Sequence, residues 1–186
     1  MYENETVNGL LSYDIYTYND KNQLEKIMKY HANLYAGFIN LENNMYTYNN
    51  NGYKRKMQIE YPQIHQTDSI LYFYNKNRLL EREMKYDGFL NIVITYIKYE
   101  YNNHGELIKE TDYSGEDGTP IRISKHSYQN GVNVKTEIFN CSNDEKIRDI
   151  RRIYDKNKNL IYVESKELSI HSSMSPYSLM KYEYYQ

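Results

Sequence analysis

The sequence has little of what would cross-link a chain or hold it in a membrane. Its 186 residues include one cysteine, Cys141, so no intramolecular disulfide can form and a reducing compartment is compatible. No run of about 18 apolar residues occurs, which excludes a membrane-spanning helix. Residues 1–14 have neither the basic segment nor the apolar segment of a secretory leader. We therefore expect a cytoplasmic protein that does not associate with membranes; a mature secreted form whose leader has been removed would have the same sequence pattern and is the alternative.

An excess of charge of one sign is also missing. The chain has 23 Lys and Arg against 25 Asp and Glu, a formal net charge of −2, so no long-range field attracts nucleic acid. Two short basic segments, 54–56 and 148–152, are interleaved with acidic or apolar residues and are interpreted as solvated strand faces. We expect no nucleic-acid partner.

Recognisable catalytic and metal-binding motifs are scarce. Asp155 to Asn159 matches the first three ligand positions of a calcium loop, but Leu160 stands where that loop requires glycine. A nucleophilic pair of Cys141 with a histidine has no local signature to support it. The five histidines are far apart and lack zinc-ligand spacing: His31, His65, His104, His126 and His171. The sequence predicts no catalytic residue, no metal, no cofactor and no enzyme activity.

Tyrosine is the abundant feature, and it recurs at a regular interval. The chain has 24 Tyr, four Phe and no Trp, together with 22 Asn. A tyrosine followed by a short turn rich in Asn, Asp and Gly, and usually by Leu, begins at Tyr18, Tyr48, Tyr74, Tyr101, Tyr128 and Tyr154. The intervals are 30, 26, 27, 27 and 26 residues. Because such turns lie between strand-like segments, the repeating unit is predicted to be a β-hairpin.

Pairs of tyrosines two residues apart precede several of these turns. Residues two apart share one face of a strand, so stacked hairpins would align the pairs on one side of a sheet. The predicted binding face comprises Tyr16, Tyr18, Tyr46, Tyr48, Tyr72, Tyr74, Tyr99 and Tyr101. The opposite face carries residues such as Ile15, Met45 and Phe73 early in the chain, then Lys98 and Glu100. The pattern leaves open which face is buried.

These observations predict an all-β fold: an antiparallel meander of about six repeated hairpins, with 10–13 strands in a twisted, curled sheet or partial barrel. A single domain over 1–186 is expected, with units near 10–41, 42–64, 65–92, 93–119, 120–143 and 144–186. At most one or two short helices are expected, because residues 20–37 and 142–154 have helix-cap spacing. The register of the repeat favours strands in both. Pro62, Pro120 and Pro176 are predicted to lie in connections.

The repeated tyrosine turn, followed by Leu and a strand rich in Lys and Glu, resembles the YD repeat of Rhs-type bacterial toxins over residues 13 to 162. The resemblance implies hairpins stacked in an extended, twisted antiparallel sheet, and it carries over no functional residue. Glycine is kept only in the turns after Tyr48, Tyr101 and Tyr128, and six units are too few to enclose a cargo.

Three functional hypotheses remain. The first is a non-enzymatic protein-binding module, more narrowly a cytoplasmic bacterial immunity protein that neutralises a toxin effector, because tyrosines are rigid contact residues beside adaptable polar ones. The second is a carbohydrate or cell-wall binding module in which tyrosines stack on sugar rings. The third is a structural role in which the tyrosines fill the interior and bond through their hydroxyls. A monomer or a dimer paired through sheet edges is expected.

Overall fold

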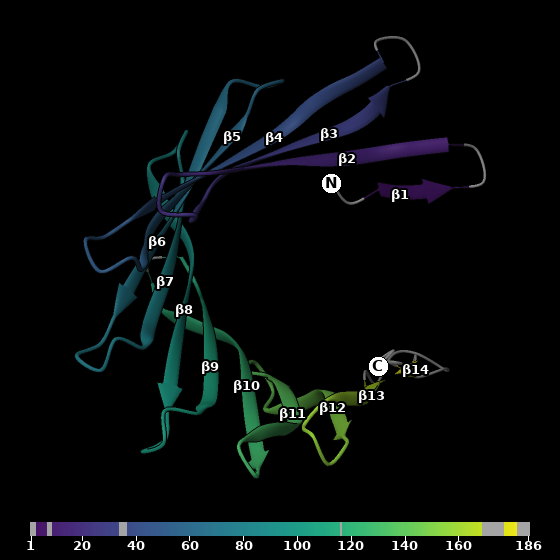
Figure 1. Cartoon of the computed structure of the whole chain (residues 1–186). Coiled ribbons are helices and arrows are strands. Elements are labelled where there is room, and N and C mark those ends of the chain that lie inside the picture. The colour runs from purple at the N-terminus through teal and green to yellow at the C-terminus, as the bar shows by residue number, and fades with distance from the viewer. Residues whose placement is uncertain (1–2, 7–8, 34–36, 116, 169–176, 182–186) are drawn as a thin grey trace. The chain divides into compact units, whose positions relative to one another are not determined.

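The protein is described by a computed structural model over residues 3–6, 9–33, 37–115, 117–168 and 177–181, and it is built from strands alone (Figure 1). The strands are β1 (Glu3–Thr6), β2 (Gly9–Tyr18), β3 (Leu24–Asn33), β4 (Gly37–Tyr48), β5 (Lys54–Tyr61), β6 (Gln66–Tyr74), β7 (Leu80–Asp87), β8 (Ile92–Tyr101), β9 (Leu107–Ser114), β10 (Thr119–Gln129), β11 (Val132–Asn140), β12 (Glu145–Tyr154), β13 (Leu160–Glu167) and β14 (Tyr177–Lys181).

The strand order in the sheet follows the order along the chain from β1 to β14, and the recorded pairings are antiparallel. The predicted all-β meander is therefore confirmed, with six consecutive hairpins from β2–β3 to β12–β13. The described residues form fourteen strands, more than the predicted 10–13, because the short strands β1 and β14 flank the hairpins. The two segments with helix-cap spacing contain β3 and β12, so the favoured strand interpretation is correct. In the described part of the chain, no helix suited to crossing a membrane occurs.

One turn geometry recurs where a hairpin follows a tyrosine. The residue after the tyrosine starts the turn: Asn19, Asn49, Asn102 and Asp155. Its side-chain oxygen accepts bonds of 2.8–3.0 Å from the backbone N–H groups two and four residues later. The residue three positions later has a positive φ, and it is Gly52 or Gly105 in two of these turns. Asn and Asp favour turns because their side chains replace a backbone acceptor.

The hairpin after Tyr128 uses a shorter turn. Asn130 and Gly131 have φ angles of 55° and 75°, as in the two-residue turn that matches the twist of a hairpin. Beside four of the turns the register also shifts by one residue, so that one strand carries an extra residue. These extra residues are Glu25, Arg55, Val134 and Ile161. Each bulge changes which later residues share a face.

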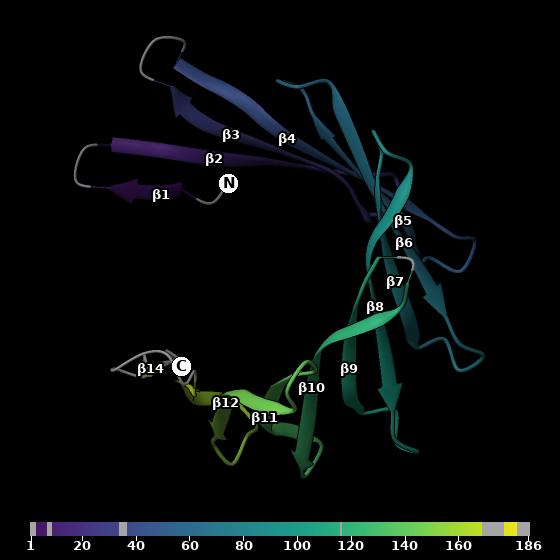
Figure 2. The ribbon, with the colours of Figure 1, turned by 180° about the vertical axis from the view of Figure 1, so that it is seen from behind.

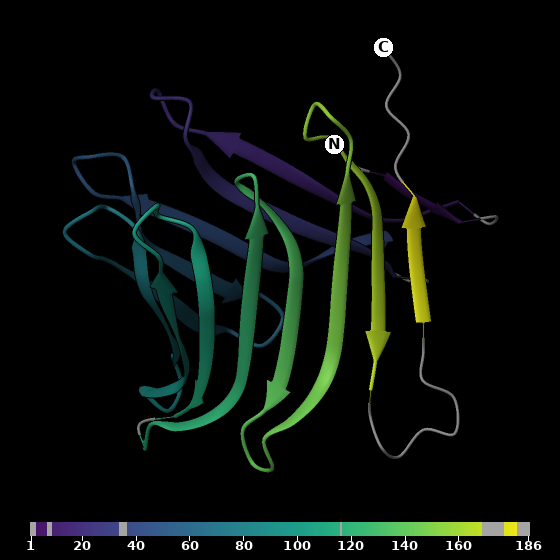
Figure 3. The same cartoon turned by 90° about the horizontal axis from the view of Figure 1, so that it is seen from below.

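The chain divides into two compact units, whose strands Figure 2 shows from behind. Unit 1 comprises residues 1–75 and 82–95, and unit 2 comprises residues 76–81 and 96–186. The green and yellow strands of unit 2 lie side by side in Figure 3. Among the described residues, three apolar side chains are buried, Ile59, Val93 and Val163, while thirteen large apolar side chains are exposed. The strands of each unit therefore keep many side chains half-buried.

The proline prediction is correct at one described position and wrong at another. Pro62 lies between β5 and β6, as expected. Pro120 is instead the second residue of β10, opposite Tyr113, where the register shifts before Arg122. A bulge at a strand start tolerates proline because no regular ladder bond is lost there. Pro176 lies outside the described residues.

Candidate functional site

One side of unit 1 gathers most of the predicted tyrosines. The register places five residues directly opposite one another across β2 to β6: Tyr16, Ile27, Asn44, Ile59 and Asp68. Residues two positions along a strand share this side. We call it the tyrosine face; it carries the predicted Tyr16, Tyr18, Tyr46, Tyr48, Tyr72 and Tyr74, together with Tyr61. Alternation along the strands therefore brings six of the eight predicted tyrosines together.

The rings on the tyrosine face already have intramolecular contacts. Burial raises the pKa of the Tyr72 hydroxyl well above its usual range, and burial raises the pKa of Tyr46 in the same direction. The Lys54 ammonium lies 4.8 Å from the ring centroid of Tyr46. Tyr74 contacts Tyr53 with the ring centroids 5.2 Å apart. The Tyr46 and Tyr72 hydroxyls stay protonated at neutral pH, and part of the ring surface of Tyr46 and Tyr74 is occupied.

Tyr18, at the end of β2 next to the first turn, is 58% exposed. The other two predicted tyrosines lie elsewhere. Tyr99 and Tyr101 are on β8 in unit 2. The structure gives the places of these eight tyrosines, and their role in binding stays a prediction.

Several tyrosine hydroxyls have a structural role. Each donates a hydrogen bond to a backbone carbonyl 21 or 24 residues earlier in the chain, in the first strand residues after the preceding turn. The pairs are Tyr48 with Leu24 at 2.7 Å, Tyr101 with Leu80 at 2.8 Å and Tyr154 with Asn133 at 2.9 Å. The repeat therefore connects neighbouring hairpins through its turn tyrosines.

Two ion pairs lie on the tyrosine face. The Lys29 ammonium lies 2.7 Å from Glu42, and the Asn44 amide donates to the same carboxylate at 2.8 Å. Burial opposes ionisation of Glu42, but these two hydrogen bonds outweigh it and hold the pKa of Glu42 below its ordinary value. Lys85 lies 3.8 Å from the buried carboxylate of Asp68. The face is therefore a mixture of rings, amides and neutralised charges.

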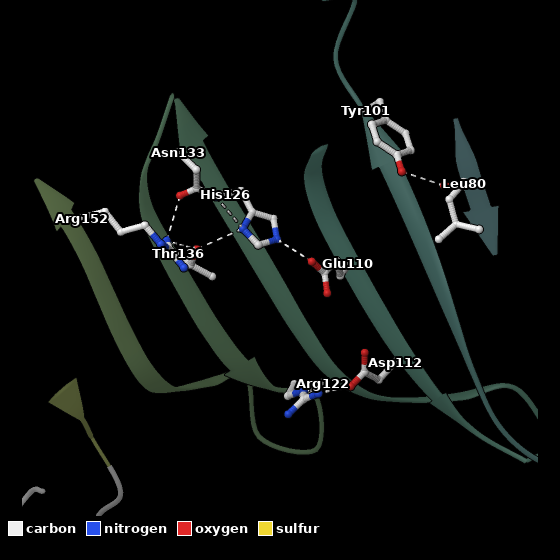
Figure 4. Close-up of polar contacts among 9 residues, drawn as sticks. All are labelled: Leu80, Tyr101, Glu110, Asp112, Arg122, His126, Asn133, Thr136 and Arg152. Carbon is white, nitrogen blue, oxygen red and sulfur yellow. Dashed lines mark hydrogen bonds and ion pairs between the residues drawn. The ribbon is translucent and has the colours of Figure 1, made fainter. Parts of the chain in front are cut away.

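Unit 2 carries a connected polar group that we call the histidine network: Glu110, His126, Asn133, Thr136 and Arg152 (Figure 4). His126 lies between Glu110 and Thr136, with its Nε2 and Nδ1 atoms each 3.1 Å from the respective oxygen. Arg152 donates to Asn133 at 3.0 Å and to Thr136 at 2.9 Å. Four neighbouring strands, β9 to β12, supply these side chains.

The hydrogen bonds of the network fix the tautomer of His126. Arg152 donates to the Asn133 oxygen, so the Asn133 amide nitrogen faces His126 Nδ1 at 3.1 Å and donates to it. Nε2 then carries the proton and donates to Glu110. A carboxylate, an imidazole and a hydroxyl in this order can activate a nucleophile. Thr136 is only 4% exposed, so a substrate cannot reach its hydroxyl.

The opposite side of unit 2 is rich in positive charge, and we call it the basic face. Cross-strand pairing aligns Lys109, Lys125, Glu137, Asp149 and Lys166 on it. Its charged residues are Lys98, Lys109, Lys125, Lys135, Lys146, Arg151, Lys166 and Lys181 against Glu100, Glu137, Asp149 and Glu164. Basic side chains outnumber acidic ones two to one, although the whole chain is slightly acidic.

Ion pairs on the basic face meet at Glu137. Lys135 and Lys146 lie 2.8 and 2.9 Å from its carboxylate. Hydrogen bonds from Lys135 and then Lys146 lower the pKa of Glu137 to about 2. Nearby, Tyr96 and Tyr113 stack with centroids 4.5 Å apart. The face therefore combines lysines with aromatic rings.

Sequence reasoning did not find the histidine network or the basic face. The segment 148–152 was interpreted as a solvated strand face, but its two outer arginines have defined partners. Arg148 pairs with Glu167, and Arg152 belongs to the histidine network. Only Arg151 of the three is exposed, on the basic face. Alternation along β12 puts Arg148, Ile150 and Arg152 on one face, which the sequence could have indicated. Their partners could be found only from the register with β11 and β13.

Other predicted chemical groups stay apart. Burial raises the pKa of the Cys141 thiol, which disfavours a reactive thiolate. Asp155 is a turn residue that binds backbone N–H groups. In the described ranges, no three His, Cys, Asp or Glu side chains are placed to hold a metal ion together.

Comparison with known proteins gives distant similarity of structure. No protein-family model matches the chain, and no curated protein sequence is significantly similar to it. A porin-like protein from Bacteroides uniformis is similar over 89% of this chain and 87% of its own, with 10% identity and a TM-score of 0.44. The TcdB2-TccC3 structure is similar over 98% of this chain, with 10% identity and a TM-score of 0.32. The chain covers only 12% of that TcdB2-TccC3 chain.

Proposed function

We propose that this protein is a non-enzymatic protein-binding module that uses the faces of its sheet. The observation that carries the proposal is the exposure of thirteen large apolar side chains alongside three buried ones in the described residues. A sheet normally buries one apolar face against a second layer. Ten of the thirteen lie in strands, and contiguous apolar surface rimmed by polar residues is typical of surfaces that bind other proteins.

Two further features support binding rather than catalysis. The histidine network satisfies its own hydrogen bonds, and its hydroxyl is buried at Thr136. The tyrosine face and the basic face instead place rings beside amides and charges, the composition from which protein-recognition surfaces are made.

The experiment is an affinity capture from extract of the source organism with the tagged full-length chain as bait. We expect one protein to be recovered in a fixed ratio to the bait, and mass spectrometry with intensity-based quantification measures that ratio. A Thr136→Val bait is the control for catalysis, because a binding module keeps its partner when the network hydroxyl is removed. Recovery of no stoichiometric protein by the wild-type bait would refute the proposal.

The narrower form of the proposal is an immunity protein whose partner is a toxin effector. It rests on the YD-repeat resemblance of the sequence, and the low TM-scores above add nothing to it. Expressing the captured partner alone and together with this chain tests it. We expect growth inhibition that co-expression relieves; a harmless partner would leave the broader binding function and remove the immunity role.

Carbohydrate binding is the second candidate, and the exposed ring of Tyr18 favours it. A glycan array probed with the wild-type chain and with Tyr18→Ala distinguishes it. Glycan binding that the substitution abolishes, combined with no captured protein, would put carbohydrate recognition ahead of protein recognition.

A further inference from the structure

The basic face of unit 2 contains a hollow between β11 and β14. It has a volume of about 550 Å³. Its apolar lining is Val134, Ile153, Tyr162 and Leu179. Ile153 and Leu179 are 58% and 56% exposed, so this lining is open to solvent. We call this hollow the groove.

Charged side chains surround the apolar part of the groove. Lys135, Arg151, Arg152 and Glu164 line it, three basic side chains to one acidic, and Arg151 lies directly opposite Lys135 on the neighbouring strand. Farther along the same face, Lys166 and Lys125 belong to the row that crosses β9 to β13. The surroundings of the groove therefore carry the positive excess of the basic face.

We propose that the groove and the basic face around it bind an acidic segment of a partner protein, which places one large apolar side chain in the groove. Charge complementarity supports an acidic partner: this side of the sheet carries eight basic and four acidic side chains, although the chain as a whole has a net charge of −2. A central apolar residue in a pocket with a charged rim is the usual arrangement of an energetically dominant contact. The proposal names the partner class of the proposed binding function, and it rests on that function.

Two adjacent residues of β14 provide a matched test. Leu179 lies on the basic face opposite Glu164, whereas Met180 lies on the other side of the sheet opposite Val163. Their exposures are similar, 56% and 50%. Leu179→Asp and Met180→Asp therefore place the same charge on the same strand at opposite faces, and thermal unfolding of both variants shows whether either is misfolded.

The probe is a short fluorescein-labelled peptide with one Phe flanked on both sides by Glu, titrated with the full-length chain and followed by fluorescence anisotropy. We expect saturable binding that Leu179→Asp weakens by about tenfold or more, as for a central contact residue, while Met180→Asp leaves it unchanged. Arg151→Glu should weaken binding and reduce its salt dependence. The same peptide with Lys in place of Glu should not bind.

Several results would overturn the proposal. Absence of binding, equal loss in the Leu179→Asp and Met180→Asp variants, or equal binding of the lysine peptide would each reject it. Tighter binding of a short single-stranded oligonucleotide than of the peptide would assign the face to nucleic acid instead. Affinity capture separates the two levels: a partner captured equally by wild type and Leu179→Asp rejects the groove but keeps the binding function, whereas no partner for wild type rejects the function itself.

Discussion

In unit 1, the contacts between side chains of neighbouring strands are made mostly by rings and amides, whereas in unit 2 they are made mostly by ions. Tyr13 stacks on Tyr30 in unit 1 with centroids 4.8 Å apart, and Phe38 meets Tyr13 edge-on at 4.9 Å. Cross-strand ion pairs recorded for the described residues number two in unit 1 and five in unit 2, and unit 2 has three more within single strands. The same hairpin therefore accepts two kinds of cross-strand pair.

This difference shows that the turns and the strand faces are specified separately. The Asn or Asp that starts a turn binds backbone groups in both units, at Asn19 and Asn49 in unit 1 and at Asn102 and Asp155 in unit 2. Cross-strand rings and charges each contribute about 0.2–1 kcal/mol per pair, so either can complete the sheet. Ions respond to salt and pH in a way that rings do not, so the two units should differ in those responses.

The largest effect expected concerns the histidine network, which has no counterpart in unit 1 among the described residues. Thr136→Val removes the hydroxyl that accepts from Arg152 and contacts His126, without changing the side-chain shape. We expect a loss of about 2 kcal/mol in the free energy of unfolding, because a buried bond to a charged donor is broken. Urea unfolding followed by circular dichroism measures it.

Thr111 is the matched control for this substitution. It is 3% exposed, as buried as Thr136, but its hydroxyl oxygen has no hydrogen-bond partner. Thr111→Val should leave the free energy of unfolding unchanged or raise it slightly, because no bond is lost. If both variants lose the same stability, volume or strand propensity dominates, and the network contributes nothing specific to unit 2.

The contrast between turns and faces also explains what the sequence could predict. Each turn is local: Tyr48, Asn49 and Gly52 lie within five residues, so the hairpins and the meander were predictable. The tyrosine face followed from alternation within strands. The histidine network joins Glu110 to Arg152 across four strands, and the bulge at Val134 shifts the alternation between Asn133 and Thr136 on β11. Such shifts are not visible in one strand's own sequence, so the network could not be predicted.

The turn tyrosines test whether the same hydroxyl-to-carbonyl hydrogen bond stabilises both units. Tyr48→Phe in unit 1 and Tyr154→Phe in unit 2 each remove a bond to a backbone carbonyl, of 2.7 and 2.9 Å. We expect each to lower the free energy of unfolding by about 1 kcal/mol, the usual contribution of a neutral hydrogen bond. The exposed Tyr18→Phe should have no effect. A loss confined to one unit would show that the repeat is not equivalent in the two.

Acid should affect the basic face through Glu137. The ordinary pKa of this carboxyl, 4.5, falls to about 2 in the folded chain, so folding favours its ionised form. Its contribution is complete above pH 4.5 and is lost as the pH falls toward about 2. Since solvent screens the pair, we expect Glu137→Gln to cost less than about 1 kcal/mol at neutral pH. Unfolding measured across this pH range should show wild type and variant converging in acid; a constant difference would mean that charge is not the cause.

The smallest effect expected lies in the turns, at the position three residues after the turn-starting Asn or Asp. Gly52 and Gly105 occupy it with φ angles of 83° and 79°, whereas Lys158 occupies it at 65°. A left-handed conformation costs a residue with a Cβ about 1 kcal/mol, and the flexibility that glycine adds to the unfolded chain offsets part of the relief. Lys158→Gly should therefore raise the free energy of unfolding by about 0.5 kcal/mol, and Gly105→Ala should lower it by about 1 kcal/mol. Urea unfolding of both variants measures the two changes in the free energy of unfolding.

Because the nearest neighbour of the added Cβ at Gly105 is Leu79 at 3.9 Å, crowding cannot explain a loss of stability in Gly105→Ala. Changes of opposite sign in the free energy of unfolding of the two variants would establish that both turns impose the same backbone geometry, independently of the side chains on the neighbouring strands. Equal signs would show that the turns of the repeat are not interchangeable.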